Sequence, residues 1–322
     1  MSDTLQPLPH NCPGVESKDA GKASSCQGCP NAGFCSSGLA GQNTALQNAD
    51  AVEIARRLYS VRNIFIVISG KGGVGKSTIA TNVARALAIN ENVSVGLLDI
   101  DVCGPSIPRT MNLESEEVHN SMSGWSPVFV TENLSVMSCG FLLPSLDDAV
   151  IWRGPKKNGL IKQFLKDVDW GDLDYLIIDT PPGTSDEHIS IVNYLKECSN
   201  VRGAIIVSTP QEIALLDVRK QIDFCKRVNL NIVGLVENMS TFVCPKCSKS
   251  SVIFTPSTGG AQKVCDEYQI ELLGRIPLDP IIGMSCDEGT SLYDLNDTSP
   301  SVEALKQMVQ TISKKYETEN KI

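Results

Sequence analysis

The segment Ser69–Thr78, which reads S-G-K-G-G-V-G-K-S-T, constrains the fold of this chain more than any other feature. It satisfies the pattern G-x-x-x-x-G-K-[ST], with Gly70, Gly75, Lys76 and Ser77 at the fixed positions. Because glycine tolerates positive φ, such a loop can turn several backbone N–H groups inward around a phosphate chain. Lys76 then supplies a charge for the β- and γ-phosphates, and the Ser77 hydroxyl is a Mg²⁺ ligand. The residues predicted to line the nucleotide phosphates are Gly70, Gly72, Gly73, Val74, Gly75, Lys76, Ser77 and Thr78.

The segments on either side of this loop have the character that a phosphate-binding loop requires. Asn63–Ile68 is a continuous apolar run, which is typical of a parallel strand buried on both faces. Ser77–Ile89 is predicted to be a helix. Its Ile79, Val83 and Leu87 recur every four residues along one face. The order strand, glycine loop, helix therefore supports the motif.

Lys71 is a second lysine, directly after the first glycine of the loop. In a single subunit this side chain would point away from its own phosphates. The pattern resembles the deviant P-loop ATPases, in which this lysine reaches the nucleotide of a dimer partner. The alternative is a solvated loop lysine without a catalytic role.

Two carboxylates follow the next strand, which is predicted at Val93–Leu98. Asp99 and Asp101 are two positions apart at the carboxyl end of this strand, so their side chains point the same way. In open parallel sheets this edge borders the ligand crevice. We therefore expect both carboxylates beside the nucleotide.

Tyr175–Ile178 is another apolar strand, and it leads into Asp179 and a turn at Gly183. This order matches a Walker B aspartate of the Mg²⁺ shell, followed by a loop that offers an N–H group to the γ-phosphate. The alternative for Asp179 is a helix N-cap, which Pro181 and Pro182 disfavour.

The remaining pattern predicts an α/β fold, namely a doubly wound and mostly parallel sheet. Further strands are expected at Leu134–Ser138, Ala204–Ser208, Ile232–Val236 and Leu272–Ile276. Helices are expected at Ala49–Val61 (with Asp50 as its cap), Lys156–Asp167, Glu212–Val228, Gly259–Tyr268 and Ser301–Lys315. The last helix has a polar face of mixed sign, unlike a membrane-targeting helix. We predict an ATPase domain at 49–322 behind a cysteine-rich extension at 1–48.

Composition narrows the class of function. The 322 residues are 42% hydrophobic, enough for one large domain plus an appendage. A net charge of −9 argues against a nucleic-acid surface. Met1–Pro9 lacks the basic and apolar regions of a signal peptide, and no apolar run approaches the ~18 residues of a membrane span. We expect a soluble intracellular protein.

The chain has 12 cysteines, and in a reducing compartment clustered cysteines more often hold metal than form disulfides. Four of them lie in the first 35 residues, a region too poor in apolar side chains to fold by burial but able to be ordered by a metal centre. These are Cys12, Cys26, Cys29 and Cys35. By count they suit [4Fe–4S] or Zn²⁺ equally, but their spacing is not the two-plus-two pattern of a zinc ribbon. We therefore favour an iron–sulfur cluster over zinc, and both over an unliganded segment.

A second pair, Cys244 and Cys247, can make half of a tetrahedral site. Cys265 and Cys286 of the same chain could supply the other half, although neither has a paired spacing. The same pair from a second subunit could also supply it, because a two-fold axis duplicates every residue near it. Lys71 independently indicates such a face-to-face dimer.

The motifs together resemble the Mrp/MinD branch of the deviant P-loop ATPases. They are Ser69–Thr78, Asp99-x-Asp101-x-x-Gly104-Pro105-Ser106, Trp152-Arg153-Gly154-Pro155, Asp179-Thr180-Pro181-Pro182-Gly183-Thr184-Ser185-Asp186 and Cys244-x-x-Cys247. The N-terminal cysteines resemble those of the larger cytosolic iron–sulfur scaffolds of the Nbp (NUBP) type. The match spans residues 12 to 295.

This resemblance implies an ATP hydrolase that assembles a [4Fe–4S] cluster between subunits at Cys244 and Cys247 and transfers it to cytosolic and nuclear apoproteins. It implies a stable second cluster at the N-terminus, and ATP and Mg²⁺ as cofactors. The implied assemblies are a homodimer or a heterotetramer with a smaller paralogue, working with targeting factors and without nucleic acid or membrane. The resemblance also assigns roles: Lys71 acts in trans, Asp99 and Asp179 support Mg²⁺, Asp101 orients the attacking water, and Asn238 contacts the adenine.

Three other classes of related ATPase fit the sequence less well. An ATPase that targets tail-anchored proteins needs a methionine-rich insert, whereas the 7 methionines here are dispersed. A partitioning ATPase needs a basic face or a lipid-binding tail, and the sequence shows neither. A nitrogenase-reductase-like electron donor bridges its cluster with single, well-separated cysteines rather than a C-x-x-C pair.

Overall fold

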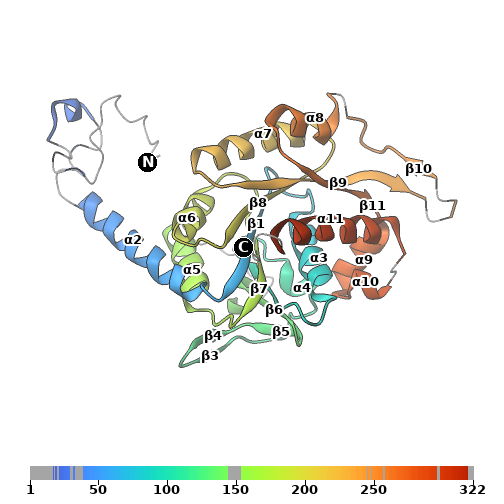
Figure 1. Ribbon diagram of the computed structural model, residues 1–322, viewed down its shortest axis with the longest axis horizontal. Coiled ribbons are helices and arrows are strands. Elements are labelled where there is room, and N and C mark those ends of the chain that lie inside the picture. Colours follow the sequence, from blue (N-terminus) through green and yellow to red (C-terminus); the bar gives the residue numbers. More distant parts are fainter. Residues whose placement is uncertain are drawn as a thin grey trace.

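The computed structural model in Figure 1 describes most of the chain beyond residue 38 and a part of the N-terminal segment. The described residues are 17, 19, 22–29, 32, 39–143, 154–244, 246–247, 249–256, 258–295 and 298–317.

One 9-stranded sheet organises the chain, in the order β10-β9-β8-β1-β7-β2-β6-β5 with β11 beside β9. Neighbouring strands are parallel except that β5 is antiparallel to β6 and β10 is antiparallel to β9. The strands are β1 Val61–Ile68, β2 Val95–Asp99, β5 Val128–Thr131, β6 Leu134–Ser138, β7 Leu173–Asp179, β8 Val201–Ser208, β9 Ile232–Val243, β10 Ser250–Ser251 and β11 Leu272–Leu278. A separate hairpin consists of β3 His119–Ser121 and β4 Gly124–Ser126. The predicted doubly wound, mostly parallel sheet is confirmed.

Helices cover both faces of this sheet (Figure 1). On one face pack α2 Leu39–Arg57, α5 Gly154–Asp167, α6 Asp186–Leu195, α7 Glu212–Arg227 and α8 Gly260–Tyr268. On the other face pack α3 Lys76–Ala88, α4 Ile107–Thr110, α9 Pro280–Glu288, α10 Leu292–Leu295 and α11 Pro300–Glu317. Two short 3₁₀ turns complete the described elements, η1 Ser24–Cys26 and η2 Cys139–Leu142.

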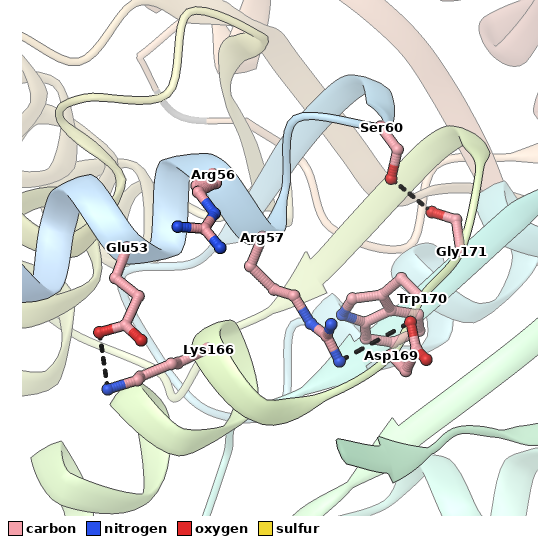
Figure 2. Close-up of a pocket in the computed structure, with 8 residues that line it drawn as sticks. All are labelled: Glu53, Arg56, Arg57, Ser60, Lys166, Asp169, Trp170 and Gly171. Atoms are coloured by element: carbon pink, nitrogen blue, oxygen red, sulfur yellow. Dashed lines mark hydrogen bonds and ion pairs between the residues drawn. The ribbon is translucent and has the colours of Figure 1, made fainter. Parts of the chain in front are cut away.

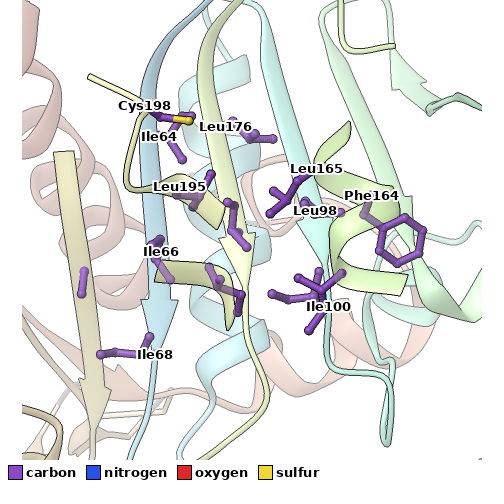
Figure 3. Packing of buried hydrophobic residues seen from close by; sticks show 14 of the residues in the cluster. Ile64, Ile66, Ile68, Leu98, Ile100, Phe164, Leu165, Leu176, Leu195 and Cys198 are labelled. Atoms are coloured by element: carbon purple, nitrogen blue, oxygen red, sulfur yellow. The ribbon is translucent and has the colours of Figure 1, made fainter. Parts of the chain in front are cut away.

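The alternation of side chains along β1 explains why the strand is apolar throughout. Ile64, Ile66 and Ile68 point into the core under α5 and α6, as Figure 3 shows. Phe65 and Val67 point into the opposite core under α3 and α11. A strand buried on both faces has no solvent side, so its sequence is a continuous run rather than an alternating one.

Several predicted boundaries are wrong. The helix predicted at Ala49–Val61 differs at both ends, because it stops at Arg57 and Val61 already belongs to β1. Helix α2 begins at Leu39, ten positions before the predicted start, so Asp50 lies inside the helix instead of capping it. The carboxylate of Asp50 pairs with Lys162 of α5 at 3.1 Å. No proline precedes Asp50 between residues 39 and 49, so nothing in the sequence stops the helix there. Strand β9 continues past the predicted Val236 to Val243, because β10 and β11 give its second half hydrogen-bonding partners.

None of the helices within the described ranges is long and apolar enough to cross a membrane.

Candidate functional site

The phosphate-binding loop connects β1 to α3, and two of its glycines are required by steric contact. Gly75 has a φ of +86°, and a Cβ at this position would lie 2.2 Å from the side-chain nitrogen of Asn238. A Cβ on Gly70 would lie 2.4 Å from Cβ of Asp217 on α7. Any larger residue at either position would push the loop off its supports.

A cavity of about 190 Å³ opens at this loop. Its lining brings together most of the predicted nucleotide residues with Asp101 and one residue of the loop after β7. The lining residues are Ser69, Lys71, Gly72, Gly73, Gly75, Lys76, Ser77, Thr78, Asp101 and Pro182. Val74 is buried beneath the loop rather than exposed to the cavity. Gly70 is also absent from the lining, so six of the eight predicted loop residues form the concave site. Lys71, expected to point away from its own phosphates, lines the cavity of its own chain.

Asp179 joins the lysine and the serine of the motif. One carboxylate oxygen accepts from Lys76 Nζ at 2.7 Å, and the other accepts from the Ser77 hydroxyl at 2.5 Å. Lys76 is 6% exposed and the Asp179 side chain is 1% exposed, so the ion pair is buried. The residues predicted to bind Mg²⁺ and the γ-phosphate thus lie in direct contact.

Asp99 lies beside Asp179 because β2 and β7 are neighbours in register. Burial, followed by the charge of Asp179, raises the pKa of Asp99 to about 8. Burial also raises the pKa of Asp179, against the pull of Lys76. The two carboxyl groups offer the oxygen ligands that Mg²⁺ prefers, and Mg²⁺ would bind them in competition with the protons that their raised pKa values favour. Asp99, Asp179 and Ser77 therefore fit the predicted magnesium site.

Asp101 lies in the loop that leaves β2. Its backbone N–H donates to the Asp99 carboxylate at 3.0 Å, and burial is the main cause that raises its pKa. Its position at the cavity is the one that a residue orienting an attacking water requires, and that role stays a prediction.

The loop after β7 lies against the phosphate-binding loop. Gly183 has a φ of +89°, and its N–H donates to the carbonyl of Ser69 at 2.8 Å. Helix α6 is capped by Ser185 together with His188, so Asp179 is not a helix cap. The alternative interpretation of Asp179 is therefore wrong. The role of this loop in sensing the γ-phosphate stays a prediction.

Asn238 of β9 is buried, and its side-chain amide donates to the Val74 carbonyl at 2.9 Å. This bond holds the phosphate-binding loop on β9. The predicted contact of Asn238 with adenine stays a prediction.

Cys244 and Cys247 lie in the turn between β9 and β10, where Cys244 is half-buried and Cys247 is exposed. The backbone N–H groups of Lys246 and Cys247 hold the pKa of the Cys244 thiol below its usual value. A lowered thiol pKa favours the thiolate, which is the form that binds metal. The hairpin thus presents a pair of thiols near the surface, and their binding of metal stays a prediction.

Cys265 and Cys286 do not join this pair. Cys265 is 2% exposed inside the core under α8, and Cys286 of α9 lies 4.0 Å from the Thr78 hydroxyl beside α3. Among the residues that the structure describes, no three metal-ligating side chains gather at one point. Neither Cys265 nor Cys286 therefore completes a site with Cys244 and Cys247 in this structure.

The N-terminal cysteine cluster is described only in part. Cys26 ends η1, and the N–H of Cys29 donates to its carbonyl at 3.1 Å, so the two half-buried cysteines share one turn. Cys12 and Cys35 lie outside the described residues, as do Trp152 and Arg153 of the motif Trp152-Arg153-Gly154-Pro155. The four-cysteine site stays a prediction.

Sequence reasoning missed two polar residues of the nucleotide site. Ser138 ends β6 and donates to the Asp99 carboxylate at 2.9 Å, and its position at the end of a strand was a usable signal. Gln221 of α7 donates to the two loops around the cavity, and no pattern in the sequence marks it.

A second hollow of about 330 Å³, shown in Figure 2, lies at the opposite end of β1 from the phosphate-binding loop. Its charged residues are largely paired with each other: Glu53 with Lys166 at 2.8 Å and Arg57 with Asp169 at 3.7 Å. The Ser60 hydroxyl donates to the Gly171 carbonyl at 2.7 Å. These pairs fasten α2 to α5 and to the loop before β7.

Comparisons with known proteins agree with this geometry. Residues 60–313 match the family described as ParA: NUBPL iron-transfer P-loop NTPase. A nucleotide-binding protein from Archaeoglobus fulgidus, solved in complex with ADP and with cobalt found in it, is 35% identical; the match covers 79% of this chain and 95% of that one, with a TM-score of 0.66.

Two cell-division proteins share the fold. MinD of Pyrococcus furiosus is 21% identical, with 79% of this chain and 99% of that one covered and a TM-score of 0.54. MinD of Pyrococcus horikoshii, solved with Mg-ADP, is also 21% identical, with 78% and 96% covered and a TM-score of 0.53. At these identities the likeness shows the fold alone.

Proposed function

Because this chain belongs to the NUBPL iron-transfer P-loop NTPase family, we propose that it is an ATP-dependent scaffold for iron–sulfur clusters. In this proposal the chain assembles a [4Fe–4S] cluster between two subunits and passes it to apoproteins. The cluster is cargo, and ATP and Mg²⁺ are the cofactors that drive its handling.

The nucleotide half of the proposal is supported by the buried group around Asp179. Lys76 and Ser77 are held by one carboxylate, and Asp99 adds a second beside it. The P-loop NTPase fold supports ATP hydrolysis, and the Archaeoglobus relative was solved with ADP. In our proposal, Lys71 completes the site of the partner subunit from its place at the cavity.

The metal half is supported by the β9–β10 hairpin. Cys244 and Cys247 offer two thiols near the surface, and Cys265 and Cys286 lie elsewhere. A second subunit brought face to face would add the same two thiolates and close a four-ligand site. The cobalt found in the Archaeoglobus protein supports metal binding in such relatives.

The proposal also includes features of which the structure describes only a part. Cys12, Cys26, Cys29 and Cys35 would hold a resident [4Fe–4S] cluster. The chain would act in the cytosol, and also in the nucleus, as a homodimer or with a smaller paralogue. Targeting factors and recipient apoproteins would be its other partners.

One observation carries the proposal. Cys244, whose thiol has a lowered pKa, directly follows the end of β9 at Val243, and Asn238 of the same strand holds the phosphate-binding loop through Val74. Strand β9 therefore connects the nucleotide loop to a surface pair of thiols. In an iron-transfer family, this link is what ATP-dependent handling of a cluster would need.

The test is transfer of a cluster to an apoprotein. A Cys244→Ser/Cys247→Ser chain, reconstituted anaerobically with iron and sulfide, should bind ATP normally but fail to activate apo-aconitase. A Lys246→Ala chain, changed in the same turn without loss of a thiol, should transfer as the wild type does.

Normal transfer by the double variant would overturn the scaffold proposal. If purified wild-type protein instead held zinc at this pair and gave no cluster absorbance near ~400 nm, a zinc-stapled ATPase would be the better account.

A further inference from the structure

The side-chain amide of Gln221 bridges the two loops that enclose the nucleotide phosphates. Its Nε2 donates to the carbonyl of Ser69 at 3.1 Å and to the carbonyl of Gly183 at 2.7 Å. Both partners are acceptors, so the nitrogen and not the oxygen of the amide must face them. Gln221 is 0% exposed, which leaves solvent no part in this arrangement.

The carbonyl of Ser69 accepts two hydrogen bonds in this structure. One comes from Gln221 and the other from the N–H of Gly183, at 2.8 Å. Ser69 is also 0% exposed, so water cannot replace a donor that leaves. A buried carbonyl that loses every donor is costly.

The other end of the Gln221 amide has no partner. Its Oε1 is buried, and within the described residues no donor reaches it. A residue selected for packing alone would avoid this cost, because leucine or methionine fills such a space without an unsatisfied polar atom. The two donated bonds are therefore the reason for a glutamine here.

Helix α7 is in a position to hold these loops firmly. Asp217, one turn before Gln221, contacts Gly70 so closely that a Cβ there would lie 2.4 Å from Cβ of Asp217. The neighbours Val218 and Ile222 are buried in the core beneath the sheet. The helix is thus fixed on one side and touches both loops on the other.

We propose that Gln221 is a positioning residue for γ-phosphate recognition, which allows Gly183 to exchange the Ser69 carbonyl for the γ-phosphate. An amide N–H donates fully to one acceptor, so Gly183 must release Ser69 to reach a phosphate oxygen. Gln221 keeps the Ser69 carbonyl satisfied when this happens. The inference rests on the nucleotide half of the proposed function and is independent of the cluster half.

If Gln221 has this role, replacing it should lower the affinity for the triphosphate more than the affinity for the diphosphate. Gln221→Met keeps the length of the side chain and removes both donors. With ADP bound, Gly183 can stay on Ser69, so the affinity for ADP should stay within about twofold. With a non-hydrolysable ATP analogue, Ser69 would lose its last donor, so the affinity should fall about tenfold, the effect of one hydrogen bond. The rate of ATP hydrolysis should fall by a similar factor.

The matched control is Asp223→Asn. Asp223 lies two positions further along α7, is exposed and pairs with Arg227 of the same helix at 2.7 Å. It should leave both affinities unchanged. Melting temperatures of all variants should be measured, and the ratio of ATP-analogue to ADP affinity is the readout that packing alone would not change.

An unchanged affinity ratio for Gln221→Met would overturn the inference, and so would equal weakening of both nucleotides, which indicates a packing role. If the methionine variant does not fold, Gln221→Leu is read in the same way, because a leucine side chain also donates no hydrogen bond. Failure of the wild type to bind the ATP analogue would instead overturn the nucleotide half of the proposed function.

Discussion

The nucleotide cavity and the C-x-x-C hairpin differ in how completely one chain builds them. Around the cavity, Lys76 and Asp179 form a buried pair, and Asp99 lies in register beside them. On the hairpin, Cys244 is half-buried and Cys247 exposed, with no third ligand among the described side chains. The first site is organised before anything binds, whereas the second needs atoms from elsewhere.

Because of this difference, substitutions at the cavity should affect the stability of the chain, whereas substitutions in the hairpin should affect its assembly. Removing one partner of a buried ion pair leaves an uncompensated charge in the core, so changes at the cavity affect folding. Surface positions outside the core contribute little to folding. We therefore expect substitutions in the hairpin to alter oligomerisation and metal binding and to leave the free energy of unfolding nearly unchanged.

The largest effect is expected for Lys76→Ala. It should abolish nucleotide binding and lower the free energy of unfolding by about 3 kcal/mol, because Asp179 loses its buried partner. Lys71→Ala is the matched change in the same loop, and it should leave stability and ADP binding unaltered while reducing hydrolysis. Urea unfolding and ADP titration measure both. Equal stability of the two variants would contradict the contrast.

A medium effect follows from the pKa of Asp99, raised to about 8 by burial. Between its unfolded pKa near 4 and this value, the folded chain holds a proton that the unfolded chain has released. Stability without Mg²⁺ should therefore fall as pH rises, by about 2 kcal/mol from pH 6 to 8. Asp99→Asn should flatten this slope. Urea unfolding at both pH values measures it, and a wild-type slope of opposite sign would refute it.

The sequence predicted the nucleotide site better than it predicted the boundaries of elements. A phosphate-binding loop is local, so Gly70, Gly75, Lys76 and Ser77 can be read from one segment. Asp179 could be placed as well, because parallel strands end at one edge of the sheet. The start of α2 could not, since a helix can extend through residues with no apolar period when nothing breaks it.

The role of Gln221 could not be predicted from the sequence either, for a different reason. It acts by reaching two carbonyls that are far away in sequence, at Ser69 and Gly183. No sequence pattern marks its position on α7. The amide forms its hydrogen bonds only because that helix packs against both loops. Roles of this kind depend on tertiary distances and leave no local pattern.

The smallest effect on folding is expected at the hairpin. Cys244→Ala/Cys247→Ala should change the free energy of unfolding of the metal-free chain by less than about 0.5 kcal/mol, as for other surface changes. A chelator should nevertheless remove iron from the wild-type bridging site before the N-terminal site, because the bridging site depends on a contact between subunits. Urea unfolding and iron-release kinetics test the two parts, and equal release from both sites would count against a shared cluster.

Native mass spectrometry of the reconstituted protein tests most directly whether two chains share the metal at Cys244 and Cys247. The chain to use carries Cys26→Ala and Cys29→Ala, so that any remaining cluster reports on the hairpin. The account predicts one [4Fe–4S] cluster for every two chains, present only in the dimer and absent when Cys244 and Cys247 are replaced by serine. A cluster carried by a single chain would contradict it.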